Sequence, residues 1–138
     1  MKTVDDLSPS VAERTDVSCS VLVVDDETQV RHFAARVLQR AGYGVFEAAD
    51  GAEALEMLQN GATDVECVVS DVVMPRMNGV QLMHVLSETR PDLPILLMSG
   101  YATAALIDLG ITVPCGVISK PFPGERLLEE VQRCLRKK

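Results

Sequence analysis

The chain has 138 residues, a length that suits one domain with its own hydrophobic core. Its net charge of −7 argues against generic binding to nucleic acid or to an anionic membrane, because both require a basic protein surface. No window reaches the roughly 18 apolar residues of a membrane span, and the N-terminus lacks the apolar core of a signal peptide. We therefore expect a cytoplasmic protein that binds a cation or a basic protein partner.

Four cysteines are spread along the chain without a C-x-x-C pair, namely Cys19, Cys67, Cys115 and Cys134. Metal clusters and redox motifs use closer spacings, and small disulfide scaffolds contain far more cysteine. The spacing therefore predicts buried or half-buried thiols in a reducing compartment.

Residues 1–18 are polar and acidic and predict a mobile N-terminal tail. A single domain is expected over 19–138, where short apolar runs alternate with segments of helical periodicity. The expected strands are the Val-, Ile- or Leu-rich runs at 20–24, 44–48, 65–70, 94–98 and 115–118.

Five helices are expected between and after these strands, each with one apolar face and with capping or breaking residues at its ends. Strands that alternate with helices pair in parallel, because each crossover needs a helix-sized connection. The expected fold class is therefore α/β, a doubly wound five-stranded parallel sheet with helices on both faces. The first expected helix ends at Gly42, the second runs from Asp50 to Gly61, and the third runs from Asn78 to Pro91. The fourth spans about 101–109, and the fifth begins near Pro123.

Residues that carry chemistry follow the strands at one edge of the predicted sheet, which is where doubly wound sheets form their sites. The first strand ends at Asp25 and Asp26, the third at Asp71, the fourth at Ser99 and the fifth at Lys120. Clustered carboxylates repel one another and need a compensating cation, and hard oxygen ligands in this number suit Mg²⁺. Asp71 is the carboxylate best placed to act as a nucleophile toward a phosphoryl group, with Lys120 and Ser99 as its contacts.

Four stretches in this order resemble the receiver domain of two-component response regulators over roughly residues 18–137: VLVVDDE, VVSDVVMPRMNG, PILLMSGYA and SKPF. The resemblance implies the flavodoxin-like strand order 2-1-3-4-5. It also implies that Asp71 accepts a phosphoryl group from the phosphohistidine of a sensor histidine kinase or a histidine phosphotransfer protein. A downstream protein target would then read the state of Asp71, in a protein that is not an enzyme apart from slow autodephosphorylation.

The resemblance implies further roles at matching positions. Mg²⁺, with Mn²⁺ as a substitute, would be bound by Asp26 directly, by Asp25 through water, by Asp71 and by the backbone carbonyl of Val73. The face of the fourth helix, fifth strand and fifth helix would dock a partner or form a homodimer. The residues implied to contact the phosphoryl oxygens are Ser99 and Lys120, and those implied to shape the loops are Pro75, Gly79 and Pro121, the last through a cis bond after Lys120.

Three positions differ from the family pattern or add information to it. Val117 stands three residues before Lys120, where many relatives carry a rotating aromatic that reports phosphorylation, so output through Ser99 needs backbone shifts or another side chain. Tyr101 and Val73 each lie two residues after a site residue, where they would flank the path of water to an acyl phosphate.

We expect Tyr101 beside the apolar Val73 to slow hydrolysis of the acyl phosphate. Tyr101→Ala should then shorten the lifetime of the phosphorylated protein, measured as loss of the phosphoryl mass with time. An unchanged lifetime would contradict this hypothesis and leave Tyr101 as a surface residue that contacts a partner.

Other interpretations remain open. The chain is expected to be a single-domain receiver, but the same motifs occur in receivers fused to hybrid sensor kinases, and a phosphorylation-independent docking module is a further alternative. An aspartyl phosphohydrolase would place its nucleophile after the first strand as D-x-D, and a flavin carrier would have a phosphate loop there in place of DDETQV. His32 and His84 are expected to be solvated or half-buried helix residues, not relay groups.

Overall fold

The structure is a computed structural model that describes residues 19–60, 64–100 and 115–136. The expected N-terminal tail and the expected helix at 101–109 lie outside these ranges. No helix in the described part of the chain is long and apolar enough to cross a membrane. The described elements are β1 (Ser20–Val24), α1 (Thr28–Arg40), β2 (Gly44–Ala48), α2 (Gly51–Asn60), β3 (Val65–Asp71), α3 (Gly79–Thr89), β4 (Ile95–Ser99), β5 (Val117–Ser119) and α5 (Gly124–Arg136).

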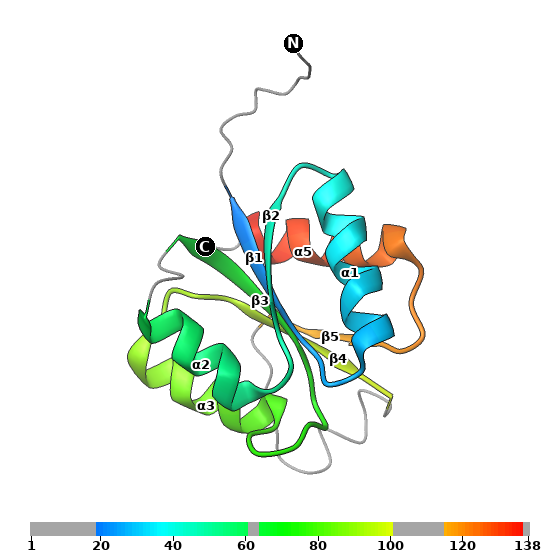
Figure 1. The fold of residues 1–138 in the computed structure, drawn as a ribbon. Coiled ribbons are helices and arrows are strands. Elements are labelled where there is room, and N and C mark those ends of the chain that lie inside the picture. The colour runs from blue at the N-terminus through cyan, green and yellow to red at the C-terminus, as the bar shows by residue number, and fades with distance from the viewer. Residues whose placement is uncertain (1–18, 61–63, 101–114, 137–138) are drawn as a thin grey trace.

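The five strands form one parallel sheet in the order β2-β1-β3-β4-β5, so the expected fold class and strand order are confirmed. Helices α1 and α5 cover one face of this sheet, and α2 and α3 cover the other (Figure 1). Because all strands run the same way, their carboxyl ends lie along one edge of the sheet.

Strand β1 lies at the centre of two hydrophobic cores, and all five of its residues are buried. Leu22 and Val24 pack into the core under α2 and α3, whereas Val21 and Val23 pack into the core under α1 and α5. A strand covered on both faces needs apolar residues at every position, which explains the uninterrupted VLVV run before the acidic residues.

Three helix ends lie at predicted residues, whereas the predicted end at Gly61 lies outside the described residues. The Asp50 carboxylate accepts a hydrogen bond from the backbone N–H of Glu53 at 2.9 Å, which caps α2. Asn78 forms a capping box with Gln81 at the start of α3. Gly42 follows α1 with φ = 102°, in the left-handed region that glycine adopts without steric cost.

The expectation of four thiols is wrong for two of the cysteines, because Cys115 and Cys134 form a disulfide. These residues are 19 positions apart in the sequence, on the segment before β5 and on α5. Their pairing depends on how α5 packs against the sheet, and cysteine spacing along the chain carries no information about that packing. Cys19 and Cys67 do not take part in this disulfide.

Candidate functional site

The predicted site residues meet at the carboxyl edge of the sheet. Asp25 directly follows β1, and its backbone N–H donates to the carbonyl of Ala48 at 3.1 Å, which continues the pairing with β2. Asp71 is the last residue of β3 and Ser99 the last of β4. Lys120 directly follows β5, and its backbone N–H donates to the carbonyl of Ser99 at 2.8 Å. The parallel sheet therefore brings together residues almost a hundred positions apart.

The Lys120 ammonium lies between two carboxylates. Its Nζ is 2.9 Å from Asp25 Oδ2 and 3.3 Å from Asp71 Oδ1, and a weaker contact of 3.5 Å reaches Glu27 Oε1. Asp25 is fully buried, and Asp71 is only 7% exposed. Buried carboxylates that share one ammonium group would repel each other without a cation, so Lys120 acts as the counter-ion of this pair.

The donor set also fits a divalent cation. One carboxylate oxygen each from Asp25, Asp26 and Asp71 can lie within 4.8 Å of the others. Asp25 Oδ2 is buried and accepts no hydrogen bond in the described part of the structure, so it keeps a lone pair for a metal although it is ion-paired with Lys120. Asp26 is exposed, so one carboxylate of the cluster faces solvent. All-oxygen ligands with open positions are typical of Mg²⁺ sites.

The loop that follows Asp71 packs against the backbone of the site. A Cβ atom at Gly79 would overlap the carbonyl oxygen of Asp71, so only glycine fits at this close approach. The Gly79 N–H donates to the carbonyl of Val72 at 2.9 Å, and the carbonyl of Pro75 accepts from Met77 at 2.7 Å. Gly79 and Pro75 thus shape the segment that holds Asp71 in place.

Comparison with known proteins identifies the family. The family model described as the response regulator receiver domain matches residues 21–132, which is most of the chain. This chain belongs to the response regulator receiver domain family. The receiver is 34% identical to the response regulator receiver protein CpdR of Brucella abortus, over 83% of the receiver and 95% of CpdR.

Other relatives place the same domain in a larger protein. The receiver is 43% identical to the sensor kinase CckA of Brucella abortus, over 92% of the receiver but 14% of CckA. The crystal structure of the receiver domain of hybrid histidine kinase CckA superposes with a TM-score of 0.70 at 35% identity, over 84% of the receiver and 98% of that chain. The chemotaxis regulator CheY4 of Vibrio cholerae gives a TM-score of 0.76 at 33% identity, over 86% and 99%.

The surroundings of Asp71 raise the pKa of its carboxyl group. Burial is the largest cause, the negative charge of Asp25 adds to it, and Lys120 together with the Val72 N–H acts in the opposite direction. Burial by itself would lower the pKa of Lys120, but Asp25 and Asp71 outweigh it and raise that pKa. The ionised form of Asp71 is therefore destabilised by its surroundings, and any additional positive charge beside it would stabilise that form.

This raised pKa gives the receiver a pH-dependent stability. A carboxyl whose pKa is higher when folded contributes stability below its unfolded pKa, near 3.8, and that contribution is lost as the pH rises through the folded pKa. In EDTA, Asp71→Asn should therefore unfold at a higher temperature than the unmodified receiver. The difference in Tm should grow between pH 4 and pH 7 in paired thermal melts. A difference that shrinks with pH would contradict the stated balance of burial and charge.

Most of the remaining predicted residues lie at or beside this edge. Ser99 is fully buried, Val117 begins β5 and is partly buried, and the Lys120–Pro121 bond is cis. The side chain of Val73 is 58% exposed, two residues beyond Asp71. Tyr101, for which a role in limiting water access is expected, lies outside the described residues. His32 and His84 are exposed helix residues.

The structure adds polar contacts that the sequence pattern did not assign. Arg31, on α1, donates to the carbonyl of Asp25 at 2.8 Å and to Glu47 Oε1 at 3.1 Å, so it ties α1 and β2 to the acidic turn. His32 Nε2 is 3.5 Å from the same Glu47 oxygen. Glu27 is the third acid of the run that follows the first strand in the sequence. Its backbone N–H donates to Asp25 Oδ1 at 2.9 Å. Nothing in the local sequence could have indicated the pairing of Arg31 with β2.

A second missed contact fixes the loop after Asp71. Arg76 adopts φ = 65°, and its guanidinium contacts Asp50 through two hydrogen bonds of 2.9 and 3.1 Å. The hydrogen bond from Arg76 is the largest cause of the lowered pKa of Asp50. A left-handed arginine is costly, and the two-point contact with the start of α2 offsets that cost. The positive φ of Arg76 left no signal in the sequence, because arginine is not a residue that favours it.

Proposed function

We propose that this receiver takes a phosphoryl group onto Asp71 in a Mg²⁺-dependent reaction, and that the phosphorylated form switches a protein–protein interaction. The observation that carries the proposal is the placement of Asp71. Its carboxylate lies 3.3 Å from Lys120 and belongs to a three-carboxylate cluster with Asp25 and Asp26 at the open edge of the sheet. A nucleophilic carboxylate with cations on two sides is the arrangement that phosphoryl transfer requires.

The side chains would divide the reaction between them. A carboxylate oxygen of Asp71 forms a bond to phosphorus as the bond between phosphorus and the donor histidine nitrogen breaks. Lys120, whose Nζ lies 3.3 Å from Asp71 Oδ1, would neutralise the oxygens of the transferred group, and the Ser99 hydroxyl at the end of β4 would donate to them. The raised pKa of Asp71 reflects a carboxylate that burial and the charge of Asp25 destabilise, and the product of the transfer is an acyl phosphate.

The cation site belongs to the same proposal. Asp25, Asp26, Asp71 and the carbonyl of Val73 would hold Mg²⁺, with Mn²⁺ as a substitute. The bound ion supplies positive charge to the phosphoryl oxygens and relieves the repulsion among the carboxylates. Asp25 Oδ2 supports this assignment, because it is buried and Lys120, 2.9 Å away, is its ion-pair partner in the described part of the structure.

Lys120 links phosphorylation to a change of shape. In the unphosphorylated receiver its ammonium is occupied by Asp25 and Asp71. A phosphoryl group would attract it away, and the hydrogen bond between the Lys120 N–H and the Ser99 carbonyl couples the ends of β4 and β5. With Val117 in place of an aromatic, we infer that the output is carried by the backbone of these strand ends.

The donor and the target follow from the same chemistry. The phosphoryl donor would be a sensor histidine kinase or a histidine phosphotransfer protein, and the 43% identity to a segment of CckA is consistent with a receiver that serves such a relay. The similarity to CckA agrees with a receiver within a hybrid kinase, and the similarity to CpdR agrees with an independent response regulator. In either setting, the receiver would present the face of the expected fourth helix, β5 and α5 to a downstream protein or to a second copy of itself; the fourth helix lies outside the described residues.

The test is intact-mass spectrometry after incubation with acetyl phosphate, with Mg²⁺ or with EDTA. We expect a gain of one phosphoryl group that requires Mg²⁺ and is absent from Asp71→Asn. Asp64→Asn is the matched control, because Asp64 is an exposed acid just before β3, at the opposite end of the strand. If the unmodified receiver gains no mass, a phosphorylation-independent docking module becomes the better description.

A further inference from the structure

The disulfide between Cys115 and Cys134 joins the segment before β5 to α5 in one of the two hydrophobic cores. The two Cα atoms are 5.7 Å apart, within the usual range for a disulfide. Cys115 is 4% exposed and Cys134 is fully buried. The bond therefore connects two elements that are already packed together.

Non-covalent contacts hold the two cysteines in position independently of the bond. Arg133, the neighbour of Cys134 on α5, donates to the carbonyl of Cys115 at 2.5 Å and to Glu130 at 2.6 Å. Gly116 has φ = 115°, and a Cβ there would lie 2.8 Å from the Arg133 guanidinium, so glycine makes room for this contact. The segment before β5 is thus held to α5 by the hydrogen bond from Arg133 as well as by the disulfide.

A hydrogen-bond acceptor for a reduced Cys134 lies beside the disulfide. Cys134 Sγ lies 3.7 Å from the carbonyl oxygen of Cys115, a distance at which a thiol donates a weak hydrogen bond. After reduction, this carbonyl oxygen is an acceptor beside the Cys134 thiol.

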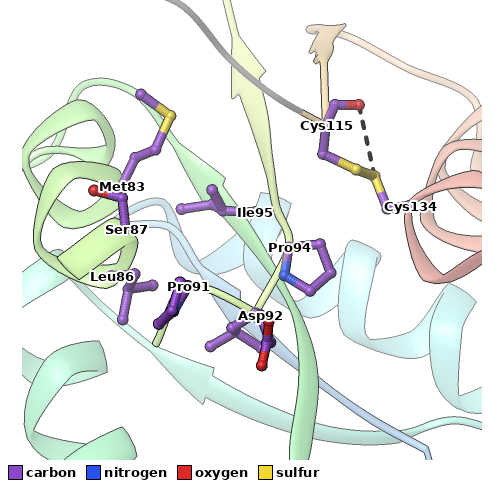
Figure 2. Close-up of a pocket in the computed structure, with 10 residues that line it drawn as sticks. Met83, Leu86, Ser87, Pro91, Asp92, Pro94, Ile95, Cys115 and Cys134 are labelled. Atoms are coloured by element: carbon purple, nitrogen blue, oxygen red, sulfur yellow. Dashed lines mark hydrogen bonds between the residues drawn. A yellow bond between two sulfur atoms is a disulfide. The ribbon is translucent and has the colours of Figure 1, made fainter. Parts of the chain in front are cut away.

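The disulfide adjoins a cavity. A cavity of about 660 Å³ is lined by both cysteines and by residues of α3, β4 and the turn between them. Figure 2 shows the disulfide facing this space from one side, across from Met83, Leu86 and Ile95. A thiol reagent or a low-molecular-weight disulfide fits in a cavity of this size.

We propose that Cys115 and Cys134 are a reversible dithiol–disulfide couple, a redox modification site at the end of the sheet opposite the carboxylate cluster. The oxidant is a low-molecular-weight disulfide such as oxidised glutathione. One cysteine thiolate attacks a glutathione sulfur and expels a glutathione thiolate, and the second cysteine then attacks the mixed disulfide and expels the other. Two protein thiols lose two electrons and two protons, and one oxidised glutathione becomes two reduced molecules.

The bond constrains the strand that leads to Lys120. Cys115 lies two residues before β5, and Lys120 directly follows β5. The carbonyl of Gly116 accepts from Leu97 at 3.1 Å, so this segment belongs to the pairing of β5 with β4. Oxidation adds a covalent tie between this short edge strand and α5, and it closes a loop with a sequence separation of 19.

The experiment uses the full chain, equilibrated in glutathione buffers from fully reduced to fully oxidised, quenched in acid and alkylated after unfolding. Intact mass should show four alkylated cysteines in the reduced protein and two in the oxidised protein, with peptide mapping that assigns the protected pair to Cys115 and Cys134. Dithiothreitol should restore all four. Oxidation should raise Tm by about 10 °C, as expected for a closed loop of this length.

Two serine variants separate this couple from general thiol chemistry. Cys115→Ser should lose both the protection and the redox-dependent part of Tm, whereas Cys19→Ser should keep both. Four alkylated cysteines at every glutathione ratio, protection of Cys19 or Cys67, or a bond that dithiothreitol does not open under native conditions would each overturn the proposal. The alkylation pattern of the unmodified chain decides the matter even if Cys115→Ser fails to fold.

Discussion

Lys120→Met is expected to slow phosphoryl transfer to Asp71 by about 10²–10³-fold while Mg²⁺ binds at least as tightly as before. The rate falls because methionine has no charge to place against the phosphoryl oxygens, and the loss of one such contact typically costs this much. Mg²⁺ binding is kept because Lys120 competes with the metal: its Nζ lies 2.9 Å from Asp25 Oδ2 and 3.3 Å from Asp71 Oδ1. Removing it makes the site more negative.

The same substitution should destabilise the metal-free protein. Asp25 is fully buried and Asp71 nearly so, and Lys120→Met leaves their like charges without a counter-ion. Breaking a buried ion pair on one side costs about 3 kcal/mol. We expect Mg²⁺ to restore much of this loss, because the ion replaces the missing positive charge. The low Tm of Lys120→Met in EDTA and its recovery in Mg²⁺ are read from the same thermal melts.

The measurements are the time course of phosphoryl mass with acetyl phosphate at saturating Mg²⁺, and a Mg²⁺ titration by calorimetry. Arg126→Met is the control, because it removes one positive charge from an exposed position on α5. A Lys120→Met rate within a few-fold of the unmodified receiver would remove Lys120 from the phosphoryl site. Mg²⁺ binding weakened tenfold or more would place Lys120 in support of the metal instead of in competition with it.

The sheet, and the edge of it where the site lies, could be predicted from the sequence. Apolar runs such as VLVV have the length and composition of strands buried on both faces, and the residue that follows each run is then placed at the carboxyl edge by parallel pairing. This is why Asp25, Asp71 and Lys120 could be grouped before any contact was known. The distances between them, and the position of Lys120 between two carboxylates, depend on strand register and twist.

Contacts between elements are the part that the sequence could not supply. The pairing of Cys115 with Cys134 follows from the packing of α5 on the sheet, and the contact of Arg31 with Glu47 follows from the packing of α1 beside β2. The left-handed Arg76 was equally hidden, because its φ is held by Asp50, 26 positions earlier in the chain. Each of these features is tertiary, so local periodicity and turn preferences carry no trace of it.

Removal of Mg²⁺ should lower the stability of the receiver by an amount set by the carboxylate cluster. A ligand present at 100 times its dissociation constant stabilises the folded state by about 2.7 kcal/mol, which corresponds to a rise in Tm of about 10 °C for a domain of this size. Most of this rise should be lost in Asp26→Asn. Asp26 is exposed, so its replacement removes a ligand at little cost to folding.

Asp64→Asn is the matched control for this linkage, because it removes the same charge from an exposed aspartate at the other end of β3. Melts in EDTA and in increasing Mg²⁺ should show the full shift for Asp64→Asn and little for Asp26→Asn. Equal shifts in the two variants would mean that Mg²⁺ only screens the net charge of −7. Asp26 and Glu27 would then be solvated turn residues without a metal, and Lys120 alone would balance the buried Asp25 and Asp71.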